Sequence, residues 1–135
     1  MKIRSRWIIF DKWKIFLVKN IKNDFYCLPG WKVEEWEMMK QWFEREIFEE
    51  LWVRPEVWQL VHIQEFIYKE QTNLEFWYLI TNPEDFKNID LSKTSHSFEI
   101  GNCGFYDLDE VDFDYKPLEL KEILEKVKKW EFLKS

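Results

Sequence analysis

Residues 28–53 read LPGWKVEEWEMMKQWFEREIFEELWV, a short loop followed by a helical pattern. Apolar side chains recur at every fourth position of this pattern, at Met39, Phe43, Ile47 and Leu51. Residues four apart lie on the same side of an α-helix, so the pattern predicts a helix over 37–51 with one face against a core. Pro55 follows shortly afterwards, at a position typical of a helix stop.

A second face of the same helix is acidic. Glu46, Glu49 and Glu50 are spaced i, i+3, i+4, which places their side chains within about 100° of one another. Like charges this close repel, and a hard divalent cation relieves the repulsion because it takes carboxylate oxygens as ligands. The alternative is a solvated acidic face with Lys40 and Arg45 as counter-charges, and the glutamate spacing alone favours that alternative.

The residues around the glutamates change that balance. The segment resembles the Nudix box, G-x5-E-x7-R-E-U-x-E-E-x-G-U, in which U is a bulky aliphatic residue. The matching positions are, in order, Glu37, Arg45, Glu46, Ile47, Glu49, Glu50 and Val53. The residues before the box and the later segments EFIYKEQTNLEFWYLI and FEIGNCGFYDLDEV also look like Nudix domains, so the resemblance covers most of the chain.

The resemblance implies a fold, an activity and a metal. Nudix domains are α+β proteins with an α/β/α sandwich, in which helices flank a mixed, mostly antiparallel sheet. Nudix enzymes hydrolyse the diphosphate linkage of a nucleoside diphosphate joined to another moiety, with Mg²⁺ or Mn²⁺. Pyrophosphate is polyanionic, so an acidic protein needs metal ions to bind it. The implied partner is a small nucleotide, whose identity the box does not specify.

Carried over residue by residue, the resemblance also implies a metal site. Glu49 and Glu50 would be ligands, and Glu46 would be a ligand or the base that activates water. The carbonyl oxygen of Gly30 would be a further ligand. Glu99 precedes a predicted strand in a region from which Nudix domains often supply an additional acid, and the alternative for it is a plain surface residue.

Other side chains would support this site. Arg45 would hold the glutamates by ion pairing, and Glu37 would brace the loop against the helix. Three aromatic side chains could stack on a base, although aromatic residues in strands more often belong to the core. They are Phe25, Tyr68 and Trp77.

Tryptophan stands where the family has glycine. Trp31 and Trp52 occupy the two glycine positions of the box, and Trp36 occupies a position that is commonly Gly. The chain has nine Trp, only three Gly and no Ala, a composition that suggests a Nudix sequence whose small residues were replaced by Trp. Glycine is favoured where φ is positive or the backbone approaches another group closely, so Trp31 and Trp52 predict strain and impaired catalysis.

Two alternatives to an enzyme follow from these substitutions. The first is an engineered or degenerate Nudix-fold scaffold or binding module with little or no catalysis. The second is a generic α+β binding domain with a chance acidic helix, which the box makes the weakest of the three readings.

The rest of the chain predicts strands and a second helix. Strands are expected over 1–10, 15–18, 25–28, 57–68, 74–80 and within 98–108, with a helix over 117–132. A turn is expected at 11–14, and loops at 69–73 and 82–97. The length corresponds to a single domain over 1–135, and we expect a monomer or homodimer.

Charge and composition restrict the partners. The 20 basic and 26 acidic residues give a net charge of −6, which argues against binding along duplex nucleic acid. Apolar runs are much shorter than the ~18–20 residues of a membrane-spanning helix, and no secretory signal pattern is present, so a cytoplasmic protein is expected. The two cysteines, Cys27 and Cys103, fit neither a metal pattern nor a disulfide framework and are predicted to be free thiols.

Overall fold

The computed structural model describes residues 2–32, 53, 56–89 and 100–134. Its first two strands, β1 (Lys2–Asp11) and β2 (Lys14–Asn20), form a hairpin in which Phe10 pairs with Ile15. Lys12 takes a φ of 57° in the turn, so the hairpin closes without the Gly or Asn that such turns favour. Both strands and the turn at 11–14 are therefore confirmed.

A second hairpin, β5 (Val57–Tyr68) and β6 (Gln71–Ile80), confirms the other predicted strand pair. Its connection is tighter than the loop expected at 69–73. Lys69 and Glu70 have φ values of 50° and 62° and close a two-residue turn of the kind that suits antiparallel hairpins. β6 therefore begins at Gln71, earlier than the start predicted at Leu74.

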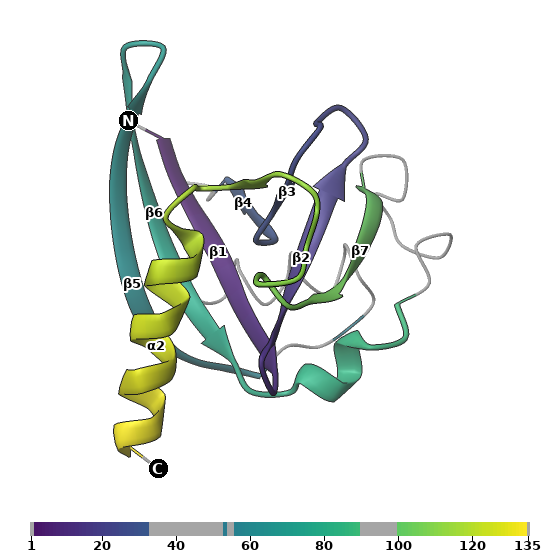
Figure 1. Ribbon diagram of the computed structural model, residues 1–135. Helices are drawn as coiled ribbons and strands as arrows, with labels where there is room; N and C mark the ends of the chain where they lie inside the picture. The colour runs from purple at the N-terminus through teal and green to yellow at the C-terminus, as the bar shows by residue number, and fades with distance from the viewer. Residues whose placement is uncertain (1, 33–52, 54–55, 90–99, 135) are drawn as a thin grey trace.

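β1 is the central strand of the sheet (Figure 1). It runs parallel to β6, in register from Lys2 opposite Asn73 to Ile9 opposite Ile80. Along its other edge, β1 pairs with the short strand β4 (Gly30–Lys32), with Arg6 opposite Gly30.

The second half of the sheet is built on β2. It pairs with β3 (Tyr26–Cys27) and β7 (Ile100–Tyr106), and β3 runs parallel to β8 (Tyr115–Lys116). Among the described strands, only the β1–β6 and β3–β8 pairs are parallel. The predicted mixed, mostly antiparallel sheet is confirmed.

Helix α2 (Leu120–Lys134) covers one face of the sheet (Figure 1). Its buried side chains pack in a cluster with residues of both hairpins. The helical members of this cluster are Leu120, Ile123, Leu124 and Val127. The helix predicted over 117–132 is thus confirmed, with a later start at Leu120. Leu118 precedes the helix and is 84% exposed, and Leu120 takes the buried place instead.

A second apolar cluster lies on the other side of β1. Trp7 and Ile9 belong to this cluster, whereas Ile8 belongs to the cluster under α2. Both faces of β1 are therefore covered, which explains its continuous apolar run. Phe86 joins the second cluster from a short 3-10 helix, η1 (Pro83–Phe86), in a segment expected to be a loop.

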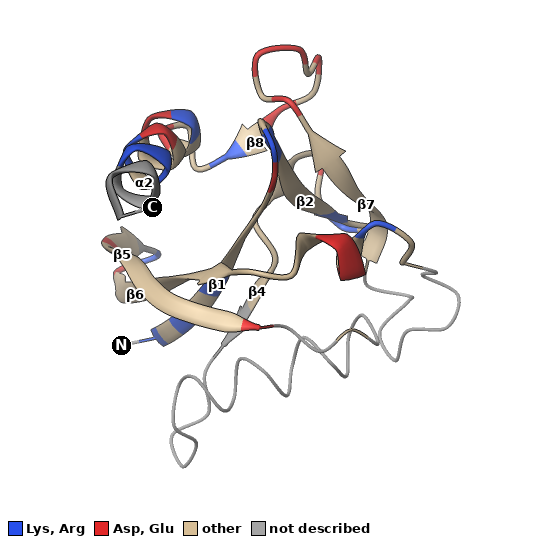
Figure 2. Ribbon diagram, turned by 90° about the horizontal axis from the view of Figure 1, so that it is seen from below, with Lys and Arg blue, Asp and Glu red and all other residues tan. Residues whose placement is uncertain are grey.

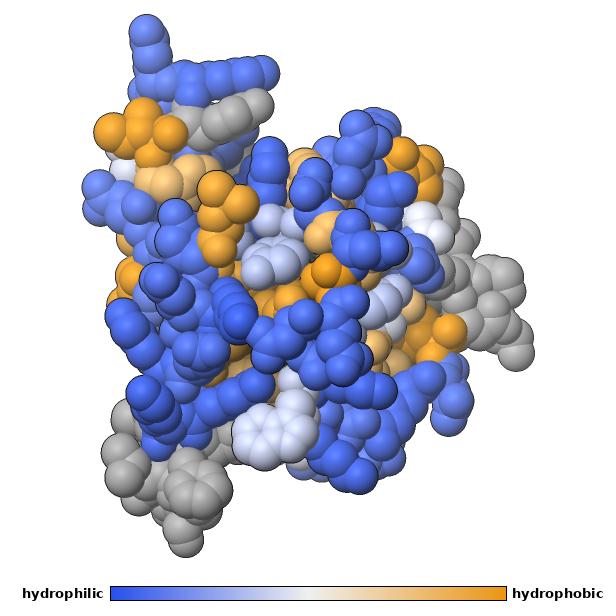
Figure 3. Space-filling model, viewed as in Figure 1, coloured by the Kyte–Doolittle hydropathy of each residue, from blue (hydrophilic) through white to orange (hydrophobic). Residues whose placement is uncertain are grey.

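The described residues have the predicted α+β class, with a curled mixed sheet and α2 on one face. The helix predicted over 37–51, the second flanking element of the sandwich, lies outside the described residues. Figure 2 shows acidic residues gathered in the loop that follows β7. Hydrophilic residues cover most of the face in Figure 3, with smaller hydrophobic groups between them. No helix in the described part of the chain is long and apolar enough to cross a membrane.

The backbone at Trp31 corrects the expectation of a positive φ at this position. Trp31 lies in β4 opposite Ser5, in an extended conformation that any L-residue adopts. Among the described non-glycine residues, only Lys12, Lys69 and Glu70 have positive φ. A left-handed backbone at position 31 is therefore the wrong expectation, while Trp52 and Trp36 lie outside the described residues.

Candidate functional site

A cavity of about 880 Å³ opens beside β1. Both hairpins line it, together with β3, β4 and the segment that leads into α2. Its apolar walls come mainly from Val18, Leu28, Phe66, Trp77 and Ile100, and its charged residues are Arg4, Arg6, Glu75, Lys116 and Glu119. A concave, largely apolar space with a few converging polar groups is typical of a small-molecule site.

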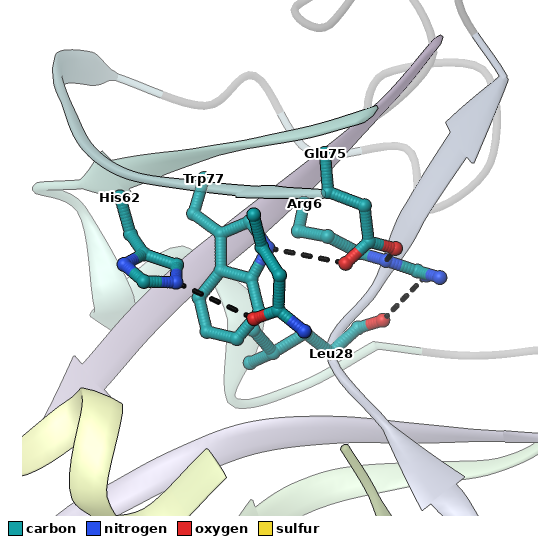
Figure 4. A network of polar contacts seen from close by, with 6 residues as sticks. Arg6, Leu28, His62, Glu75 and Trp77 are labelled. Atoms are coloured by element: carbon teal, nitrogen blue, oxygen red, sulfur yellow. Dashed lines mark hydrogen bonds and ion pairs between the residues drawn. The ribbon is translucent and has the colours of Figure 1, made fainter. Parts of the chain in front are cut away.

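Glu75 organises the polar wall of this cavity (Figure 4). Residues two apart on a strand face the same way, so β6 directs Glu75 and Trp77 to one side, where they are 4% and 0% exposed. Arg6 Nε donates to Glu75 Oε2 at 2.9 Å, and Trp77 Nε1 donates to Glu75 Oε1 at 3.3 Å. Arg6 Nη1 also donates to the Leu28 carbonyl oxygen at 3.3 Å. The Arg6 guanidinium thus compensates the buried carboxylate and ties β1 to β6 and to the loop before β4.

His62 and Gln64 extend the network along β5. The His62 ring meets the Trp77 ring edge to face, with 4.8 Å between centroids. His62 Nε2 lies 3.4 Å from Gln64 Oε1, and Gln64 lines the cavity. His62 therefore packs against the wall residue Trp77.

Arg4 is the second guanidinium in the wall. It lies two residues before Arg6 on β1 and is half-buried. Burial lowers the pKa of Arg4, and the neighbouring charge of Arg6 lowers it further, while Glu75 acts in the opposite direction. No residue in the described part of the chain forms a hydrogen bond or ion pair with the Arg4 side chain.

Gly30 stands in the wall because no side chain fits there. A Cβ at this position would lie 2.1 Å from the Ser5 carbonyl oxygen and 2.7 Å from Arg6 Cδ. The glycine therefore permits close approach of β4 to β1, and its φ is not positive. Of the predicted metal ligands, only Gly30 lies among the described residues, and it lines the cavity.

The other predicted site residues lie outside the described part of the chain. They are Glu37, Arg45, Glu46, Glu49, Glu50 and Glu99. Within the described residues, no group of three or more His, Cys, Asp or Glu side chains could hold a metal ion.

The two cysteines and the three aromatic residues predicted as candidates for base stacking differ in their surroundings. Cys27 is a free thiol whose pKa is raised by burial, and burial raises the pKa of Cys103 to about 11. Both thiols are therefore protonated at neutral pH and are poor nucleophiles. Trp77 is a fully buried wall residue, whereas Phe25 is half-buried beneath Lys116 Nζ, 4.4 Å from its ring centroid. The side chain of Tyr68 lies outside the described part.

The polar wall was not anticipated from the sequence. Arg4 and Arg6 lie in the strand predicted over 1–10 and Glu75 in the strand predicted over 74–80, and no site role is predicted for any of the three. The sequence does contain a signal for this wall. Two positive charges lie two residues apart in one apolar strand, and a negative charge lies within another. That signal predicts a buried ion pair only once the two strands are known to be neighbours.

Glu75→Leu is expected to lower the free energy of unfolding by about 2 to 3 kcal/mol. Removing one partner of a fully buried ion pair costs ~3–5 kcal/mol. The expected loss is smaller here because the Arg6 side chain is 19% exposed. The double variant Arg6→Met/Glu75→Leu should recover most of the loss, since no unpaired charge remains. Urea unfolding of the parent, the single variants Glu75→Leu and Arg6→Met, and the double variant measures this coupling. Additive losses would mean that the two side chains do not act as a pair.

The fold that carries this cavity also occurs in solved structures of other proteins. No protein-family model and no curated protein matches the sequence. Solved structures do match: a MutT NUDIX hydrolase from Burkholderia pseudomallei superposes with a TM-score of 0.74 at 21% identity, over 93% of this chain and 97% of that one. The dihydroneopterin triphosphate pyrophosphohydrolase of E. coli gives 0.71 at 18% identity, over 92% of both chains.

A UDP-X diphosphatase gives a TM-score of 0.72 at 20% identity, over 96% of this chain and 64% of that chain. Identities this low establish the architecture, and the matches extend over nearly the whole sequence. The chain therefore has the fold of the Nudix hydrolases, as the resemblance of residues 28–53 predicted.

Proposed function

We propose that the protein is a metal-dependent hydrolase of the diphosphate linkage in a nucleoside diphosphate derivative, a nucleotide pyrophosphohydrolase. The observation that carries the proposal is the cavity of about 880 Å³ with Gly30 in its wall. Gly30 directly precedes the box, so the segment with the charge pattern of the box begins at the cavity. A space of this size with apolar walls and cationic groups suits a nucleotide.

The acidic helix would supply the chemistry. In this proposal Glu46, Glu49 and Glu50, with the Gly30 carbonyl oxygen, hold Mg²⁺ or Mn²⁺, and Glu99 is the candidate for an additional ligand. These donors are all oxygen atoms, the kind that both ions prefer. A bound ion would neutralise the diphosphate and lower the pKa of attacking water.

Within the same proposal, Arg45 would fix the orientation of the glutamates by ion pairing, and Glu46 would act as a ligand or as the base for water. The similar structures include a dihydroneopterin triphosphate pyrophosphohydrolase, a UDP-X diphosphatase and an ADP-ribose pyrophosphatase. Those substrates belong to those proteins, and they define the panel on which this chain should be tried.

The test is release of phosphate, pyrophosphate or nucleoside monophosphate from such a panel, with Mg²⁺ or Mn²⁺ and with excess chelator. Metal-dependent turnover of at least one nucleotide supports the proposal. Turnover that survives chelation would overturn the mechanism. Binding of nucleotides without turnover would instead support the alternative, a Nudix-fold binding module. In that module Trp31, Trp36 and Trp52 would occupy positions at which the family commonly has glycine.

A further inference from the structure

Arg4 and Arg6 stand side by side in the cavity wall but differ in their partners. They are two apart on β1, and the parallel register places Arg4 opposite Glu75 and Arg6 opposite Trp77 on β6. The Glu75 carboxylate is nevertheless taken by Arg6 at 2.9 Å and by the Trp77 indole at 3.3 Å. Both of its oxygens therefore already accept a hydrogen bond, and its charge is compensated.

The Arg4 side chain has no such direct partner among the described residues. It is half-buried, and no described residue hydrogen-bonds to it or forms an ion pair with it. A guanidinium withdrawn from water beside a second one is unfavourable unless an anion meets it, as the lowered pKa of Arg4 indicates. Among the described residues, Glu75 offsets the Arg4 charge without a hydrogen bond or ion pair to it, so the guanidinium can take an anion that enters the cavity.

The rest of the wall favours the same ligand chemistry. Asn20, Asn23 and Gln64 carry amide donors, and Lys116 brings a further cation. Of the two acids in the wall, Glu75 is already paired, and Glu119 is exposed. A guanidinium offers paired N–H donors that match two oxygens of a phosphate group, which an ammonium group cannot reproduce.

We infer that Arg4 is a specificity-determining residue that binds a phosphate group of the substrate not held by the metal. This inference rests on the proposed function, and it names the substrate class as nucleotides with one phosphate beyond the hydrolysed diphosphate. A nucleoside triphosphate or a nucleotide with a phosphorylated sugar meets this requirement. A nucleoside diphosphate sugar without a third phosphate does not.

The first experiment measures Arg4 without catalysis. Inorganic tripolyphosphate is titrated into the protein in excess chelator, and the shift in melting temperature gives the affinity. The parent should be stabilised, and Arg4→Gln should bind at least about tenfold more weakly, because a charge-assisted hydrogen bond is lost. Lys129→Gln, on an exposed face of α2, makes the same change in net charge and should bind like the parent. Arg4→Lys should fall between the two.

The second experiment measures selection between substrates. With Mg²⁺, Arg4→Gln should lower kcat/KM for a nucleoside triphosphate about tenfold while leaving that for ADP-ribose nearly unchanged. Equal tripolyphosphate affinity in the parent and Arg4→Gln, or equal losses on both substrates, would overturn the role of Arg4. Loss of tripolyphosphate binding in a protein that hydrolyses nothing would support Arg4 as an anion site and reject the proposed function alone.

Discussion

Glu50→Gln should reduce metal-dependent hydrolysis by about 10²- to 10⁴-fold in kcat, since several kcal/mol of charge stabilisation by the ion depend on ligands of this kind. The amide has the same shape as the carboxylate but lacks the charge that holds a divalent cation. The measurement is initial rate against Mg²⁺ concentration on the best substrate of the panel.

Glu125→Gln is the matched control, because Glu125 is an exposed residue of α2 and the change in charge is the same. Its rate should equal that of the parent. The double variant Glu49→Gln/Glu50→Gln should also lose the rise in melting temperature that Mg²⁺ gives the parent. An unchanged rise would place the metal elsewhere in the protein and reject the helix face as its site.

Gly30→Ala should destabilise the protein by at least about 1 to 3 kcal/mol, the usual range for overpacking. The added Cβ would lie 2.1 Å from the Ser5 carbonyl oxygen, a backbone atom that cannot swing aside. β4 would have to move away from β1, and the Arg6 side chain, 2.7 Å from the new atom, would move with it. Hydrolysis should fall as well, because the cavity wall changes shape.

Gly104→Ala provides the comparison for this experiment. Gly104 lies in β7, where an added Cβ would meet the Tyr106 side chain at 3.4 Å, close to an ordinary contact. This substitution should be neutral or stabilising by up to about 1 kcal/mol, since alanine restricts the unfolded chain. Urea midpoints and slopes of both variants give the result. Similar losses at the two positions would show that close strand contact is not what requires glycine at position 30.

The long strands could be predicted because their side chains carry the information locally. The bounds of β5 coincide with the predicted range, and β1 follows its apolar run. β4 and β8 contain three and two residues, too few for any periodic pattern, and they exist because β1 and β3 offer free edges. Their partners, and hence the strands themselves, are set by tertiary structure.

The candidate site likewise has a part that the sequence predicts and a part that it does not. The box places its charged residues within one loop and helix, so sequence spacing alone identifies Glu46, Glu49 and Glu50. The polar wall joins Arg6 to Glu75 across 69 residues, and the parallel register that brings them together has no local signature. Trp31 shows the opposite error, in which a family glycine suggested a left-handed backbone that the β4 strand does not have.

The parallel pairing of β1 with β6 also sets the order in which the protein can be assembled during synthesis. The first hairpin ends at Asn20, but the partner of β1 is complete only at Ile80, 60 residues later. At a synthesis rate of about 5 to 20 residues per second, the hairpin waits roughly 3 to 12 seconds for that partner. Ile8 and Ile9 are fully buried in the finished protein, but during this interval only nearby residues of the hairpin shield them from water. The edge of β1 is also free to pair with other chains. The nascent chain is therefore most prone to aggregation between the synthesis of residues 20 and 80, before any residue of α2 has been made.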